Sequence, residues 1–149
     1  MKIQALVSVQ YQRGVAAIEF ALVSTVLFTL LFGIMEFGRL LFYWNTATEA
    51  TRLGARVAVV CDQNAANIKA KMTALFPVIE NGDIVINYLP GGCDATTCEQ
   101  ITVSIARTTP IQTFIPFVPL SLTLPSFSTT LPRESMKSII DGVANPVCS

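Results

Sequence analysis

Residues 15–38 read VAAIEFALVSTVLFTLLFGIMEFG, and this stretch decides the fold. Its charged residues are Glu19 and Glu36, so the 21 residues from Val15 to Met35 carry a single charge. About 20 apolar residues cross the hydrocarbon core of a bilayer as an α-helix. A buried helix of a soluble domain is the weaker interpretation, because the apolar side chains occupy all faces. We therefore predict a transmembrane helix that begins at Val15.

A secretory signal peptide is another interpretation of such a segment. Its apolar core is usually about 7–15 residues long, and a small-residue cleavage site follows it. The apolar run here is longer, and Thr48-Glu49-Ala50 matches such a site poorly. We therefore expect the helix to be retained in the mature chain.

The composition favours a membrane protein and disfavours several other classes. Apolar residues make up 52% of the chain and charged residues 13%, against about 25% charged in ordinary soluble domains. Ten basic residues balance ten acidic residues, so there is no basic field to attract nucleic acid. The chain has no histidine, which is the commonest general base and zinc ligand. We expect no metal, no cofactor and no enzymatic activity, since catalytic motifs are also lacking.

Gly14 and Glu19 are the most informative residues near the start of the span. Gly14 directly precedes the apolar segment, and Glu19 lies five residues after it, inside that segment. A carboxylate in this position is costly and indicates a function and a partner. If the chain is cut after Gly14, Val15 acquires an α-amine, and the amine of a neighbouring subunit could pair with Glu19. Alternatively, Glu19 is a helix-end carboxylate stabilised by the positive helix N-terminus.

This pattern resembles the leader and cleavage site of type IV prepilins, in which a membrane peptidase cuts after the glycine. The downstream sequences EFGR (36–39) and ATRLGAR (50–56) narrow the resemblance to TadE-like proteins. These are minor pilins, or pseudopilins, of the tight-adherence (Flp) pilus system. The resemblance covers about residues 13–60. It implies a leader over residues 1–14 that is cut between Gly14 and Val15, and a registration role for Glu19 with Phe20.

The resemblance also implies partners and a location. The partners are a prepilin peptidase, other Tad minor pilins, the major Flp pilin and membrane lipid. The location is the bacterial inner membrane or the pilus, with a cytoplasmic N-terminus. Lys2 and Arg13 favour this orientation, whereas three arginines after the span, Arg39, Arg52 and Arg56, oppose it. The alternative function is an uncleaved single-pass protein whose outer domain binds a partner.

The helix is expected to continue beyond the membrane to about Val60, because the first proline is Pro77. Glu36 with Arg39, and Glu49 with Arg52, are three residues apart and can pair on the helix surface. Four small residues share one side at spacings of three and four and permit close packing; they are Ala47, Ala50, Gly54 and Ala58. Their packing partner is either the chain's own sheet or another pilin helix.

Residues 61–149 are expected to form a small extracytoplasmic α+β domain with an antiparallel, pilin-like sheet. An amphipathic helix is predicted over 64–76, with Ile68, Met72, Leu75 and Phe76 on one face. Strands over 83–89 and 100–107 read as a β-hairpin. Five prolines between residues 108 and 132 predict a loop, followed by an edge strand at about 120–131. The apolar part of this loop covers the sheet or forms an interface.

The four cysteines suit disulfides in an exported domain. Four cysteines allow three connectivities. By proximity, Cys93 pairs with Cys98 inside the hairpin loop, and Cys61 pairs with Cys148. A zinc site is disfavoured because the spacing is wrong and no histidine completes a ligand set.

Overall fold

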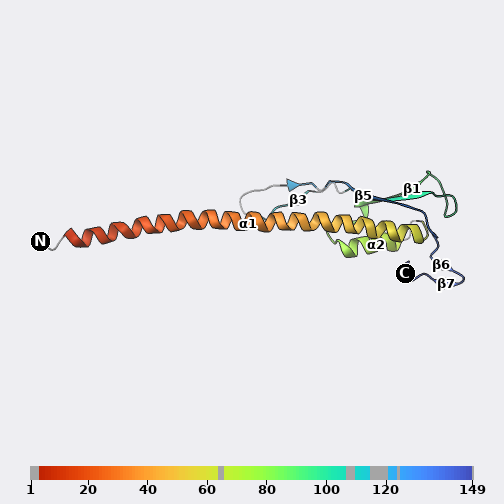
Figure 1. The fold of residues 1–149 in the computed structure, drawn as a ribbon, viewed down its shortest axis with the longest axis horizontal. Coiled ribbons are helices and arrows are strands. Elements are labelled where there is room, and N and C mark those ends of the chain that lie inside the picture. The colour runs from red at the N-terminus through yellow and green to blue at the C-terminus, as the bar shows by residue number, and fades with distance from the viewer. Residues whose placement is uncertain (1–3, 64–65, 107–109, 115–120, 124, 149) are drawn as a thin grey trace.

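A computed structural model describes residues 4–63, 66–106, 110–114, 121–123 and 125–148. One long helix, α1 (Gln4–Val60), runs the length of the molecule, and a small α+β domain surrounds its C-terminal half (Figure 1). The 57 residues of α1 extend about 85 Å at 1.5 Å per residue. The N-terminal half of α1 projects from the domain without any covering element (Figure 1). The predicted fold class is confirmed.

Helix α1 begins at Gln4 and therefore extends upstream of Val15, whereas the start of the membrane-spanning segment at Val15 stays a prediction. Residues 4–14 contain no proline, and a single glycine costs a helix only about 1 kcal/mol relative to alanine. Gly14 therefore lies inside a continuous helix. The bond between Gly14 and Val15 is part of that helix in this structure.

Helix α2 (Ala66–Leu75) packs on one side of α1, and the main sheet packs on another (Figure 1). Ile68 and Met72 are fully buried, as is Phe76 just after the helix. Leu75 is exposed, which corrects its assignment to the buried face. The prediction over 64–76 was therefore accurate to one residue at its C-terminal end, while residues 64–65 lie outside the described part of the chain.

The main sheet is antiparallel, in the order β1-β2-β5. A short 3₁₀ turn, η1 (Asn81–Asp83), leads into β1 (Ile84–Leu89), which pairs with β2 (Gln100–Ile105). The predicted hairpin is confirmed, although β2 ends at Ile105 and residue 107 is not described. Alternate residues of β2 are buried toward α1, as period-two geometry requires; they are Ile101, Val103 and Ile105.

The predicted strand over 120–131 is divided in the structure. Strand β5 (Phe127–Pro132) is the edge strand beside β2, whereas β4 (Ser121–Leu122) pairs with β3 (Ile111–Gln112) in a separate ribbon. Pro125 lies between β4 and β5, and proline disfavours a continuous paired strand. Residues 120 and 124 are outside the described residues.

A last hairpin joins β6 (Ile139–Ile140) to β7 (Val143–Ala144) beyond the end of α1 (Figure 1). Its two-residue turn is Asp141-Gly142, with φ of 52° and 80°. Positive φ at both positions defines the turn that Asp-Gly sequences favour between paired strands. This hairpin was not predicted from the sequence, although Asp141-Gly142 is typical of such turns.

Two disulfides close the domain, and both predicted pairings are confirmed. Cys61 is bonded to Cys148 and Cys93 to Cys98. The first bridge holds the C-terminus at the end of α1. Backbone N–H groups of Met136 and Lys137 donate to the carbonyls of Val59 and Val60, at 3.1 and 2.9 Å. These bonds satisfy helix-end carbonyls that have no partner within the helix.

Candidate functional site

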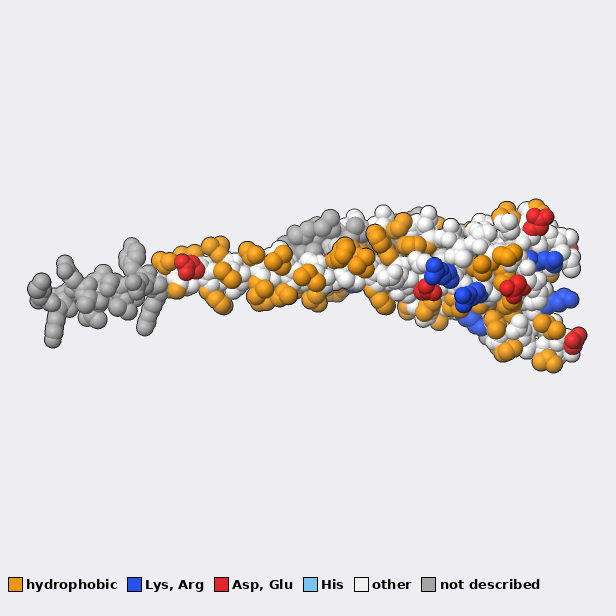
Figure 2. Space-filling model, viewed as in Figure 1, with side chains coloured by type: hydrophobic (Ala, Val, Ile, Leu, Met, Phe, Trp, Pro, Cys, Tyr) orange, Lys and Arg blue, Asp and Glu red, His pale blue; other side chains and the backbone are white. Residues whose placement is uncertain are grey.

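The candidate site begins on the uncovered N-terminal part of α1. Within the described residues, α1 is the one helix long and apolar enough to cross a membrane, and its most apolar window has no buried residue. From Val15 to Met35, large apolar side chains are exposed on every face of the helix. In the described part of this helix, Figure 2 shows mainly hydrophobic side chains with an acidic side chain near the start, whereas most charged side chains gather around the domain at the other end. Such a surface requires lipid or other apolar partners.

Gly14, Val15, Glu19 and Phe20 all lie on this uncovered surface. All four are exposed, and Phe20 is 74% exposed. A Cβ built on Gly14 would meet no atom within 4 Å. None of the described side chains forms an ion pair or hydrogen bond with Glu19. Val15 and Glu19 are four residues apart on the helix and therefore lie on the same face.

The small-residue stripe of α1, formed by Ala47, Ala50, Gly54 and Ala58, is buried inside the domain. Ala47, Ala50 and Ala58 have no exposed surface. A Cβ on Gly54 would lie 2.4 Å from Sδ of Met72 in α2 and 3.1 Å from Cγ1 of Val103 in β2. Of the two packing partners left open by the sequence, the structure therefore has the chain's own sheet, together with α2.

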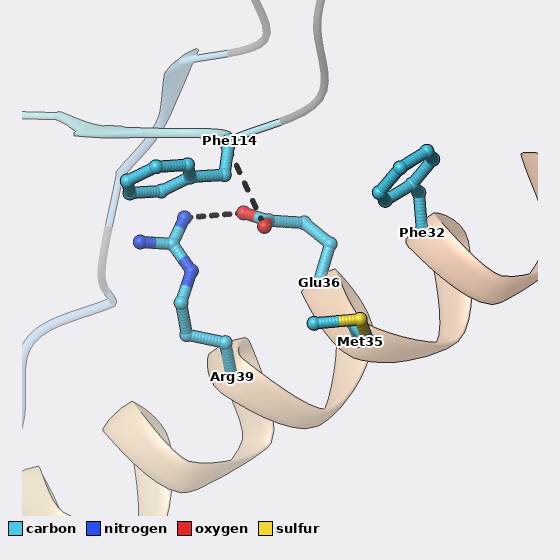
Figure 3. Close-up of a pocket in the computed structure, with 5 residues that line it drawn as sticks. All are labelled: Phe32, Met35, Glu36, Arg39 and Phe114. Atoms are coloured by element: carbon cyan, nitrogen blue, oxygen red, sulfur yellow. Dashed lines mark hydrogen bonds and ion pairs between the residues drawn. The ribbon is translucent and has the colours of Figure 1, made fainter.

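Between these two parts, Glu36 and Arg39 form an ion pair that also holds a distant segment (Figure 3). Nη2 of Arg39 donates to the carbonyl oxygen of Gln112 at 2.8 Å, and the backbone N–H of Phe114 lies 3.5 Å from Oε2 of Glu36. The guanidinium carbon of Arg39 is 5.6 Å from the ring centroid of Phe114 and 5.5 Å from that of Tyr43. Such distances permit cation–π attraction.

Glu36 and Arg39 bring opposite formal charges together in a partly buried place. Glu36 is 8% exposed. Its hydrogen bond with Arg39 raises the pKa of the arginine above its ordinary value, although partial burial opposes this. A buried carboxylate requires such a partner. Beside the pair, Phe32, Met35 and Phe114 line a mainly apolar hollow (Figure 3).

The predicted pairs Glu36–Arg39 and Glu49–Arg52 are both present. The docking of residues 110–114 on the first pair was not predicted from the sequence. The sequence left open whether the apolar loop covers the sheet or forms an interface; residues 110–114 lie along α1 (Figure 1), and most of the apolar loop lies outside the described residues. The EFGR motif (36–39) did indicate that Glu36 has a partner, since a carboxylate beside a membrane span needs one. No local signal pointed to Gln112 or Phe114.

The family comparison bears on this same part of the helix. Residues 14–56 match the family model described as TadE-like protein. Residues 14–56 form a TadE-like segment. The matched range includes Gly14, Glu19 and the Glu36–Arg39 pair, and it ends within the buried part of α1. No curated protein and no solved structure matches the chain.

The TadE-like match agrees with the resemblance read from the sequence and associates the chain with Tad pilus systems. TadE-like proteins are membrane-associated and of a structural, non-enzymatic type. Within the described residues, no cluster of three or more His, Cys, Asp or Glu side chains could hold a metal ion. The candidate site is therefore an apolar helical surface with one carboxylate, that of Glu19, near its start.

Proposed function

We propose that this TadE-like chain is a minor pilin, or pseudopilin, needed to assemble a Tad (Flp) pilus. It is made as an inner-membrane precursor and cut by a prepilin peptidase between Gly14 and Val15. The observation that carries the proposal is Glu19, an exposed carboxylate on an otherwise apolar helical surface. Such a group is tolerated in the membrane where a partner neutralises it.

Cleavage would create the partner that Glu19 needs. The new α-amine of Val15 is a cation at the start of the apolar surface, and in a neighbouring subunit it would stand at the level of Glu19. Attraction between the two charges is strong at low dielectric constant, and an unpaired buried carboxylate is strongly disfavoured. The pair would therefore set the register between adjacent helices, with Phe20 packing beside it.

The two disulfides support the proposed orientation in the membrane. The domain beyond the span contains two disulfides, which persist in oxidising compartments. A cytoplasmic N-terminus places this domain outside the inner membrane. Other Tad minor pilins and the major Flp pilin are the proposed partners, through the apolar surface of α1.

An uncleaved single-pass protein with a partner-binding outer domain is the second candidate. The continuity of α1 through Gly14 favours it, because a peptidase must open the helix at that bond. N-terminal sequencing of the protein from its host membranes discriminates between the two. The proposal expects the sequence to begin at Val15, and a sequence beginning at Met1 overturns it.

The cleavage step is tested with Gly14→Ala and the matched variant Gly33→Ala. A methyl group meets no atom within 4 Å at either position, so neither change should disturb the chain itself. We expect Gly14→Ala to leave the precursor uncut and Gly33→Ala to be processed normally. Full processing of Gly14→Ala contradicts the peptidase assignment.

The pairing role is tested with Glu19→Gln, and Glu49→Gln is its control because Glu49 is an exposed glutamate of the distal half. Glu19→Gln should be inserted and processed, yet recovered in much smaller amounts from sheared fibres or pilin complexes. Glu49→Gln should assemble normally. Unchanged piliation of the Glu19→Gln strain contradicts a registration role.

A further inference from the structure

Among the described residues of the domain that follows the span, Phe114 is the most exposed large apolar residue, at 86%. It does not lie at the distal tip of the molecule. It lies beside α1 at the level of Glu36 (Figure 3). Glu36 is the residue that follows Met35, the last residue of the apolar span. The ion pair of Glu36 with Arg39 and the hydrogen bond from Arg39 to the carbonyl of Gln112 hold the segment there.

The position along α1 defines the level of Phe114 in a membrane. The 21 residues from Val15 to Met35 extend about 31 Å as a helix, which matches a hydrocarbon core of about 30 Å. Glu36 therefore lies where the outer leaflet changes from hydrocarbon to headgroups. Since the N–H of Phe114 is 3.5 Å from the Glu36 carboxylate, the ring lies at this same level.

The helix surface around this level also has the character of an interface. Exposed aromatic residues follow the span on α1, namely Phe37, Phe42 and Trp44. Aromatic side chains, tryptophan above all, concentrate where hydrocarbon meets the headgroups. Phe37 lies about 3 Å along the helix beyond Met35, within a headgroup layer that adds roughly 5–7 Å on each side of the hydrocarbon core.

We propose that Phe114 is a second membrane contact of this chain, with its ring in the outer interfacial layer of the lipid bilayer. The apolar hollow that the ring forms with Phe32 and Met35 is continuous with the lipid-facing surface of the span. The Glu36–Arg39 pair is neutral as a unit, so it does not oppose lipid contact. With α1 alone the domain could rotate over the membrane, whereas a second contact fixes which face it turns toward the bilayer.

Fluorescence quenching by brominated lipids tests this contact in the full chain. Trp44 is the chain's one tryptophan, so a Trp44→Phe background accepts a new reporter at a chosen position. Phe114→Trp in this background is reconstituted into phosphatidylethanolamine–phosphatidylglycerol vesicles that contain phosphatidylcholine brominated at shallow or at deep acyl positions. We expect blue-shifted emission that shallow bromines quench more strongly than deep ones.

Val143→Trp in the same background is the matched control. Val143 is also apolar and 70% exposed, but it lies on β7 at the far end of the domain (Figure 1). Its reporter should emit at long wavelength and remain unquenched. If the Phe114→Trp reporter behaves in the same way, the lipid contact is wrong. If it is blue-shifted without quenching, and the shift depends on the protein-to-lipid ratio, a second protein chain covers the ring and the proposal is equally overturned.

This inference rests on the proposed membrane span, but it does not depend on cleavage or pilus assembly. Leu27→Trp, near the middle of the span, separates the two failures. If deep bromines do not quench that reporter, the span itself is wrong and the proposed function fails with it. If deep bromines quench it and the Phe114→Trp reporter stays unquenched, only the second membrane contact is wrong.

Discussion

From Val15 to Met35 helix α1 exposes leucine, phenylalanine and isoleucine on every face, whereas from Ala47 to Val59 it buries alanine, valine and one glycine. The first part has no polar face. The second part alternates small buried residues with exposed charges such as Arg52 and Arg56. The two parts of one continuous helix are therefore suited to two different environments. Large apolar side chains suit lipid or a partner helix, and small ones allow a sheet and α2 to approach the backbone.

The largest expected effect concerns the bridge that holds the distal half together. Replacing Cys61 and Cys148 by alanine opens a link between residues 87 apart and should lower the free energy of unfolding by about 4–5 kcal/mol in the chain-entropy model. The corresponding Cys93 and Cys98 double variant opens a link between residues five apart and should lose only about 2 kcal/mol. Guanidinium unfolding of the full chain in detergent, followed by near-UV circular dichroism, measures both.

The Cys61–Cys148 bridge lies wholly in the domain that follows the apolar span. Its removal should therefore not change how residues 14–35 insert into a membrane. Residues 14–35 should remain protected from protease in vesicles in both double variants. Equal stability losses from the two double variants would contradict the loop-length argument.

The next effect contrasts two glycines of α1. Gly54→Leu should destabilise the domain by about 3 kcal/mol, because overpacking displaces core side chains and Met72 and Val103 already lie against that position. Gly33→Leu should leave the domain's stability unchanged, since no atom lies within 4 Å of an added Cβ there. Thermal unfolding of the two variants in the same detergent checks the difference. A Gly33→Leu domain as unstable as the Gly54→Leu domain would show that the uncovered half is not independent of the fold.

A smaller effect contrasts the two ion pairs of α1. Arg39→Gln removes the partly buried pair and its bond to Gln112, and it should cost about 1–2 kcal/mol for the docking of residues 110–114. Arg52→Gln removes an exposed pair with a 2.9 Å contact and should cost less than about 0.5 kcal/mol. Hydrogen exchange of the amides in 110–114 measures the docking. Equal exchange in the two variants would mean that Arg39 does not hold the segment.

The smallest effect is a response of the hairpin loop to acid. Hydrogen bonds from Thr96 and Thr97 lower the pKa of Asp94 from 3.8 to about 2. Because the folded pKa is the lower one, the carboxylate stabilises the folded loop above about pH 4, and this contribution is lost as the pH falls through 2. Asp94→Asn should remove that pH dependence. Unfolding curves of the native chain and the variant between pH 5 and 2 test it, and identical slopes would contradict the assignment.

Local patterns predicted much of the fold. The absence of proline before Pro77 indicated one long helix, alternation indicated β1 and β2, and proximity indicated both disulfides. The extension of α1 upstream of Val15 was not predicted, because an apolar pattern locates a candidate membrane span, whereas helix formation depends on backbone propensity, which Gly14 barely reduces. The paired carboxylate Glu36 was visible in the sequence, but its long-range partners were not.

The sequence by itself determined that α1 is a helix apolar enough to span a membrane, and that its small residues allow close packing. Hydrogen bonding and side-chain periodicity within a helix involve residues three or four apart, so residues close together in the sequence determine both. Only the tertiary structure decided that the chain's own sheet covers the small-residue stripe and that Phe114 docks beside Glu36. Glu36 and Phe114 are 78 residues apart in the chain, and Gly54 and Val103 are 49 apart. Both contacts depend on how the whole domain closes around α1.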